Sequence, residues 1–259
     1  MAKALRHLPG GGFDSPVTGA MDRAAADGVD SHTRAGGRAG AEQPDSDGAG
    51  TAVSYHSPRL MQQADLVGAL VATAGYVSLG AAVMAGKTSD VDHALRRSQR
   101  HRAQGPRRAF GEGVKLAARP EVQLVSATVI AIAMHRAGVK GARAVIGATV
   151  GAYVADRLTK YVVHRRRPPG YHKRSKHESF PSGHTTATTA LTFTVARILE
   201  RERLVQSPSA RLVATLLTAI VGESRLAIDE HWPTDVLAGV LLGSAASSFA
   251  LAVDEAMRR

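Results

Sequence analysis

The chain has 259 residues, of which 44% are hydrophobic, 4% are aromatic and none is cysteine, and its formal net charge is +11. The absence of cysteine excludes a disulfide framework, a thiolate metal site and a cysteine nucleophile. A basic chain suggests nucleic-acid binding, but the few aromatic residues give little stacking surface for single strands. Loops beside anionic lipid headgroups, or a site for phosphate, explain the positive charge equally well.

Residues 1–65 are a polar segment rich in Gly, Asp, Ser, Ala and Pro, and 10 of the 26 glycines fall within the first 50 residues. Such a composition, without apolar periodicity, predicts disorder. The first 30 residues also lack the apolar run of a secretory signal. We therefore expect a disordered tail over residues 1–65 and a folded domain over residues 66–259.

Six apolar segments follow the tail. Residues 66–86 are uncharged and long enough to cross a bilayer, and residues 236–253 are only slightly shorter, with small residues suited to tight helix packing. The other four are residues 122–134, 144–155, 185–196 and 212–222. Ionisable residues at their ends are typical of membrane helices around a polar site. We expect an all-α, six-helix transmembrane bundle, with one or two spans and a peripheral helical domain as the alternative.

Between the first two apolar segments lies a basic, partly amphipathic stretch within residues 90–119. This pattern favours a solvated charged surface, and a helix lying along an anionic membrane is the alternative.

The first chemically active cluster closes the third apolar segment. Lys160, His164 and Arg167 are spaced by four and then three residues, so they share one face for as long as a helix lasts. The two prolines that follow predict its end. Cations also suit the negative end of a helix dipole, which by itself explains Arg165 and Arg166.

The second cluster opens the fourth apolar segment with Pro181, Ser182, Gly183 and His184. Pro and Ser predict a helix start, and Gly lets the backbone approach a bound group. The first turn of a helix binds anions through its free amides and its dipole. His184 adds a titratable group at that position.

The third cluster precedes the last apolar segment and contains Ser224, Arg225, His231 and Asp235. The guanidinium of Arg225 is suited to bidentate contact with an oxyanion. A carboxylate four residues after His231 is placed to bond one imidazole nitrogen, which leaves the other nitrogen free as a base or nucleophile.

In chain order, these clusters read Lys-x6-Arg-Pro, Pro-Ser-Gly-His and Ser-Arg-x5-His-x3-Asp. The trio resembles the type 2 phosphatidic acid phosphatase superfamily, and the resemblance covers about residues 66–253. It implies metal-independent hydrolysis of phosphate monoesters or diphosphates through a covalent phosphohistidine. No cofactor and no metal ligand is expected.

The resemblance also implies a role for each motif residue. His231 is the expected nucleophile, Asp235 orients it, and His184 protonates the leaving oxygen and then activates water. The expected ligands of the phosphate are Lys160, Arg167, Ser182, Gly183 and Arg225.

A pocket among membrane helices predicts a lipid-linked phosphate as substrate, with polyprenyl phosphates or diphosphates ahead of prenyl-linked sugar phosphates and phosphatidic acid. We expect a multi-pass protein of the cell membrane. The loops 87–119 and 157–176 carry 9 and 8 Lys and Arg residues, which favours a cytoplasmic site, whereas many bacterial members of the superfamily face outward. The side of the membrane and the oligomeric state stay open.

Two alternatives use the same features differently. One is a soluble acid phosphatase or a vanadate-dependent haloperoxidase, which share the motif set. The other is a basic, membrane-anchored binding protein without catalytic activity, whose binding would weaken with salt.

Overall fold

The computed structural model describes residues 58–100, 105–169, 178–206 and 208–259. These residues form eight α-helices and no strand, which confirms the predicted all-α class for this part of the chain. The helices are α1 (Pro58–Met84), α2 (Ser89–Arg100), α3 (Pro106–Ala117), α4 (Pro120–Arg136), α5 (Ala142–Val163), α6 (Gly183–Arg201), α7 (Ser209–Ala227) and α8 (Pro233–Ala256).

Five of the six predicted apolar segments lie within one helix each, in α4, α5, α6, α7 and α8, and the first, residues 66–86, runs two residues past the end of α1 at Met84. Within the described residues, α1 and α8 are long and apolar enough to cross a membrane, and α3 with α4 would make a third, bent span of 52°. The number of six spans is therefore not confirmed. The helices α2 and α3 form in the basic stretch, where no apolar run marks them.

Helix α1 begins at Pro58, so residues 58–65 of the predicted tail are helical. The physical reason is Asp65, which is fully buried and forms ion pairs with Arg197 and Arg201 of α6. This buried ion cluster fastens the first turns of α1 to the bundle, and the boundary moves toward the N-terminus accordingly. The tail before residue 58 lies outside the described residues.

Replacing Asp65 with asparagine is expected to destabilise the fold by about 3–5 kcal/mol, because two guanidinium groups lose their buried carboxylate. The measurement is thermal unfolding of the detergent-solubilised protein. The control is Asp90→Asn on α2, where the replaced carboxylate is exposed and a change within about 0.5 kcal/mol is expected. Equal melting of the two variants would contradict a role of Asp65 in holding α1.

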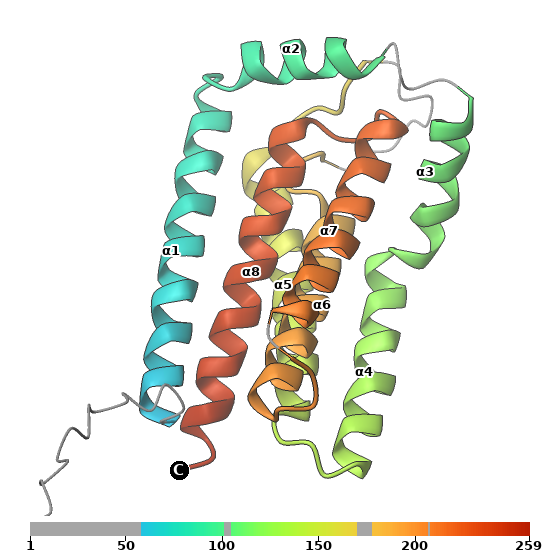
Figure 1. The fold of residues 1–259 in the computed structure, drawn as a ribbon. Coiled ribbons are helices and arrows are strands. Elements are labelled where there is room, and N and C mark those ends of the chain that lie inside the picture. The colour runs from blue at the N-terminus through green and yellow to red at the C-terminus, as the bar shows by residue number, and fades with distance from the viewer. Residues whose placement is uncertain (1–57, 101–104, 170–177, 207) are drawn as a thin grey trace, which may run out of the picture. The chain divides into compact units, whose positions relative to one another are not determined.

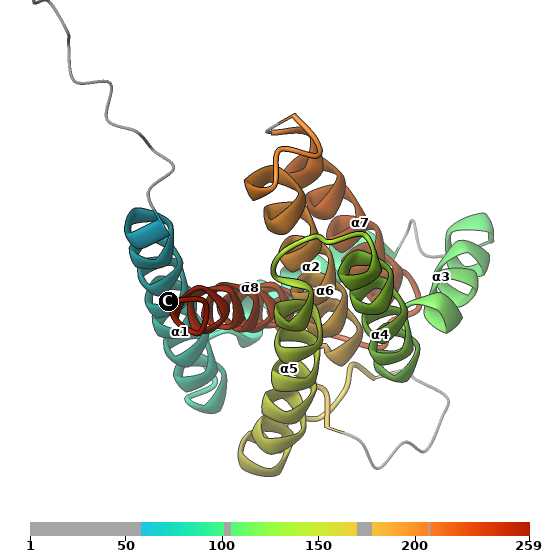
Figure 2. The ribbon, with the colours of Figure 1, turned by 90° about the horizontal axis from the view of Figure 1, so that it is seen from below.

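Helix α6 is the central helix and packs against α4, α5, α7 and α8. Helix α8 lies between α6 and α1, as the two views agree (Figure 1, Figure 2). Two glycines of α8 permit this contact: a Cβ on Gly243 would lie 2.6 Å from the carbonyl oxygen of Thr186, and one on Gly239 would lie 2.9 Å from that of Ser182. This close packing of small residues holds the start of α6 against the start of α8.

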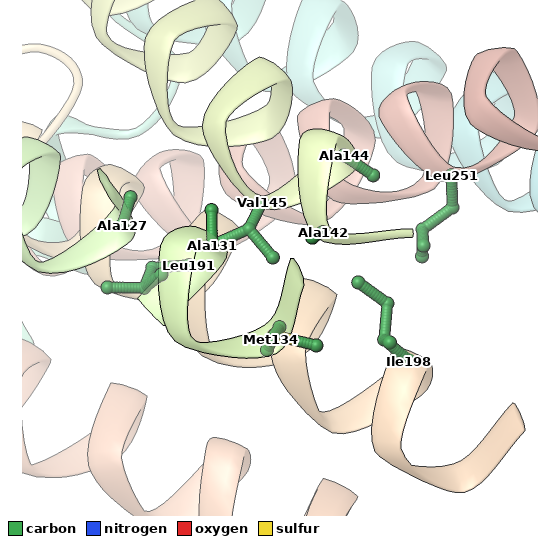
Figure 3. Packing of buried hydrophobic residues seen from close by; sticks show 9 residues of the cluster. All are labelled: Ala127, Ala131, Met134, Ala142, Ala144, Val145, Leu191, Ile198 and Leu251. Atoms are coloured by element: carbon green, nitrogen blue, oxygen red, sulfur yellow. The ribbon is translucent and has the colours of Figure 1, made fainter. Parts of the chain in front are cut away.

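The largest buried apolar cluster joins α4, α5, α6 and α8, and four of its nine residues are alanine (Figure 3). Its larger members are Met134, Val145, Leu191, Ile198 and Leu251. Small side chains at helix contacts let the backbones approach closely, as in membrane bundles. The larger apolar side chains of α1 point outward instead, since Val67, Leu70 and Val71 are 59%, 70% and 67% exposed. An apolar face of this kind is suited to lipid contact.

Candidate active site

The three motifs meet at one end of the bundle, where α5 ends, α6 begins, α7 ends and α8 begins. Hydrogen bonds join them: the amide of Ser182 donates to the carbonyl of Asp235 at 3.0 Å, and Lys160 Nζ donates to the carbonyl of Pro181 at 3.1 Å. Arg167 Nη1 donates to the carbonyl of Glu230 at 2.7 Å. These contacts therefore bring the three predicted clusters together at one end of the bundle.

A cavity of about 460 Å³ opens among these segments. Five of the eight predicted site residues line it: Lys160, Arg167, Gly183, His184 and His231. The other three, Ser182, Arg225 and Asp235, are fully buried behind its wall. The cavity thus brings both predicted catalytic histidines together with two of the predicted phosphate-binding cations.

His231 is buried in the loop before α8, and its two ring nitrogens have different neighbours. Its Nδ1 lies 2.8 Å from the carbonyl oxygen of Ser179, which can only accept a hydrogen bond, so Nδ1 carries the proton. Nε2 is then the basic nitrogen, and it lies 3.3 Å from Nη1 of Arg167. Burial, followed by the charges of Arg167 and Lys160, lowers the pKa of His231 well below its usual value. The imidazole is therefore neutral, as a nucleophile requires.

The orienting partner of His231 differs from the expected one. Asp235 Oδ2 lies 3.6 Å from Nδ1 of His231, outside hydrogen-bond range, and instead accepts the amide of Trp232 at 2.8 Å. The other carboxylate oxygen of Asp235 pairs with Arg165. In this structure the Ser179 carbonyl holds the imidazole, while Asp235 caps α8 and contributes its charge nearby.

Helix α2 supports this loop from the end of the bundle, across which it lies (Figure 1). Its Asp92 accepts the amide of Thr234 at 3.0 Å and pairs with Arg165, which also pairs with Asp235. Arg96 forms an ion pair with Asp229, the residue two places before His231. The sequence identified neither contact, because Arg165 is equally well explained as a helix-end cation.

The second motif starts α6 as predicted, with Ser182 at the N-cap position and Gly183 as the first helical residue. A Cβ on Gly183 would lie 3.1 Å from the carboxylate of Asp156, so a larger residue there would push this side chain by a few tenths of an ångström. The Nε2 atom of His184 is buried and has no hydrogen-bond partner among the described residues. Burial, with Arg225 and His231 adding to it, lowers the pKa of His184 to about 3.

The first motif departs from the expected helix. Helix α5 ends at Val163, and His164 adopts a left-handed conformation with φ of 39°, so Arg167 reaches the cavity from an extended segment. His164 points away, with 68% of its side chain exposed and Nδ1 3.5 Å from Glu178. Of these three residues only Lys160 lies on α5, so the predicted shared helical face does not form. Lys160 forms an ion pair with Asp156, a cavity residue outside the motifs.

Arg225, a predicted phosphate ligand, donates to three other groups in this structure. Its Nε donates to Ser224 Oγ, its Nη2 to the Gly111 carbonyl and its Nη1 to Glu230 Oε2, each at 3.1 Å. Glu230 also pairs with Lys115 and lines the cavity. Burial alone would raise the pKa of Glu230, but Lys115 and Arg225 lower it to about 2. A carboxylate thus stands between Arg225 and the cavity.

Residues outside the three motifs complete the cavity wall. They are Lys115, Arg119, Pro120, Glu121, Asp156, Arg157 and Glu230. The sequence marked Asp156 and Arg157 only as ionisable residues at the end of an apolar segment. It missed the others, which lie on α3, at the start of α4 and next to His231. Within the described ranges no group of three or more His, Asp or Glu side chains is placed to hold a metal ion.

The sequence profile of the PAP2 superfamily matches residues 141–258, which contain all three motifs. A solved structure, the first transmembrane PAP2 type phosphatidylglycerolphosphate phosphatase from Bacillus subtilis, is similar over 74% of this chain and 98% of its own, with a TM-score of 0.65. At 20% sequence identity, this similarity concerns the fold. No curated protein that was compared matches the chain. The two candidate spans, α1 and α8, agree with the prediction of a membrane protein.

Proposed function

We propose that this chain, which belongs to the PAP2 superfamily and is a phosphatase as its motifs predicted, hydrolyses a lipid-linked phosphate monoester or diphosphate. The observation that carries the proposal is the cavity lined by His231, His184, Lys160 and Arg167, where Nε2 of His231 lies beside Arg167 and Nε2 of His184 has no partner among the described residues.

The first half of the reaction uses both histidines. His231 Nε2 attacks phosphorus, the bond to the leaving oxygen breaks, and a phosphohistidine forms. His184 receives a proton as the substrate binds and gives it to that oxygen. Lys160, Arg167 and the amide of Gly183 stabilise the charge on the equatorial oxygens, which is the main electrostatic requirement of phosphoryl transfer.

The second half returns the enzyme to its starting state. His184, now neutral, removes a proton from water, and the resulting oxygen attacks the phosphohistidine. The phosphorus–nitrogen bond breaks and phosphate leaves, while Nδ1 of His231 keeps its proton and its bond to the Ser179 carbonyl. The proton that His184 takes from water leaves with the phosphate, so the free site again holds His184 neutral. No step is assigned to a metal ion.

The lipid part of the proposal is supported by the outward apolar face of α1 and by the position of the cavity at one end of the two candidate spans. We include in the proposal that all six apolar segments span the membrane. A lipid tail then stays in the bilayer while its headgroup enters the cavity. Prenyl phosphates and diphosphates are the first candidates. Phosphatidylglycerol phosphate, also a candidate from the sequence, is the lipid in the name of the similar protein from Bacillus subtilis.

Phosphate release from a panel of lipid phosphates, measured in detergent with excess chelator, tests the proposal. We expect release to continue at an unchanged rate after chelation. Loss of activity that is restored by added metal would contradict the metal-independent mechanism. Binding of all anionic lipids without phosphate release, weakening steadily with salt, would instead identify a binding protein.

A further inference from the structure

The cavity contains two cations, Arg119 and Arg157, that belong to none of the three motifs. Arg157 lies on α5 three residues before Lys160, which places the two side chains as neighbours on one side of the helix. Arg119 lies between α3 and α4, on another part of the same cavity wall. The motif cations and the amide of Gly183 already serve the phosphate that is cleaved, so these two arginines are additional.

Arg157 contains a buried donor that is not satisfied. Among the described side chains, three buried nitrogen or oxygen atoms have no hydrogen-bond partner, and two of them, His184 Nε2 and Arg157 Nε, belong to residues of this cavity. A buried polar atom without a partner is unfavourable by itself, so it is a sign of a missing ligand. For His184 Nε2, the reacting substrate would be the missing partner. For Arg157 Nε, the missing partner would be a second anionic group.

The protein partners of these two arginines leave room for such a group. Arg157 Nη2 lies 3.5 Å from Glu121, whose side chain is 62% exposed, and an exposed pair at that distance contributes little. The Arg157 guanidinium also lies 5.0 Å from the ring centroid of Tyr153, which orients it. Arg119 is exposed and forms no ion pair within the described residues. A phosphoryl group would gain charge-assisted hydrogen bonds from both.

We propose that Arg157 and Arg119 form a second anion subsite, and that the substrate headgroup therefore carries two phosphoryl groups. One is cleaved at His231, and the other is bound at this subsite. The inference rests on the proposed function, since it selects among lipid phosphates. Two headgroups have this chemistry: a diphosphate, whose phosphoryl groups are bonded directly, and a phosphate monoester on a phosphodiester lipid.

Two pairs of substrates test the subsite in Arg157→Gln and Arg119→Gln. The first pair is a prenyl diphosphate and the monophosphate of the same chain; the second is phosphatidylglycerol phosphate and phosphatidic acid with the same acyl chains. In at least one pair, kcat/KM for the doubly phosphorylated lipid is expected to fall roughly 10- to 100-fold in Arg157→Gln. For the singly phosphorylated lipid of the same pair, kcat/KM should change by less than about threefold. The responding pair identifies how the two phosphoryl groups are linked.

Arg108→Gln is the matched control, because Arg108 is an exposed arginine of α3 outside the cavity. It should leave both substrates of each pair unchanged. Equal losses on singly and doubly phosphorylated lipids, or no loss on any, would overturn the subsite. If Arg157→Gln does not fold, the same ratio in Arg119→Gln decides. A wild-type protein that releases phosphate from no lipid contradicts the proposed function itself, whereas an active one with unchanged ratios contradicts only the subsite.

Discussion

Replacing His231 with alanine is expected to reduce phosphate release by a factor on the order of 10⁴ to 10⁶, because the variant has no nitrogen to accept the phosphoryl group. The loss should appear in kcat and should not be recovered at high substrate concentration. Phosphate release from the best lipid of the panel measures it. Retention of more than a small fraction of activity would show that another group attacks phosphorus.

Two further measurements separate a lost nucleophile from a damaged fold. Substrate labelled in its phosphate should transfer label to the wild-type protein in a form that is lost in acid and kept in base, as a phosphorus–nitrogen bond requires, and His231→Ala should gain no label. His135→Ala is the control, since His135 is exposed at the end of α4, away from the cavity. Unfolding of either variant in detergent should match the wild type within about 1 kcal/mol, although His231→Ala leaves the buried Ser179 carbonyl with one fewer partner.

The helices that could be predicted from the sequence are those favoured by residues within the helix itself. An uncharged run of about 20 residues needs no distant partner to favour a helix, and the segments in α1 and α8 are of this kind. The start of α1 could not be predicted, because residues 58–65 are polar and Asp65 becomes a core residue only through arginines more than 130 positions away. The same holds for α2, whose Asp92 and Arg96 are buried partners of a distant loop rather than a solvated surface.

At the candidate site, residue types and spacing predicted which motifs meet, but they did not predict all their contacts. His231 and Asp235 are four residues apart, yet a carbonyl from the second motif is nearer to Nδ1 than the carboxylate is. Arg225 and Lys160 likewise have carboxylate partners, Glu230 and Asp156, that no motif contains. Such contacts depend on how three separate segments pack, and spacing along one segment carries no information about it.

Replacing His184 with alanine is expected to slow hydrolysis of an alkyl phosphate by about 10²- to 10⁴-fold, because an alkoxide leaves poorly without a proton. The pKa of about 3 means that the free site holds His184 neutral at physiological pH. The proton must therefore come by one of two routes. Either the substrate binds as the phosphate monoanion and brings it, or the bound dianion raises the pKa of His184 so that the imidazole takes it up from solvent. Either route predicts that kcat/KM falls as pH rises above about 6, where a phosphate monoester loses its second proton.

A substrate with a leaving group that needs no proton distinguishes this role from a structural one. With p-nitrophenyl phosphate, His184→Ala should form the phosphohistidine at nearly the wild-type rate, because nitrophenolate leaves as an anion. Breakdown of the intermediate should still be slow, since no base remains to activate water. The expected result is a burst of nitrophenolate equal to the enzyme concentration, followed by slow turnover. A variant that shows no burst, and is slowed equally on alkyl and aryl phosphates, would have lost the shape of the cavity rather than an acid, and His184 would then be a positioning residue for His231.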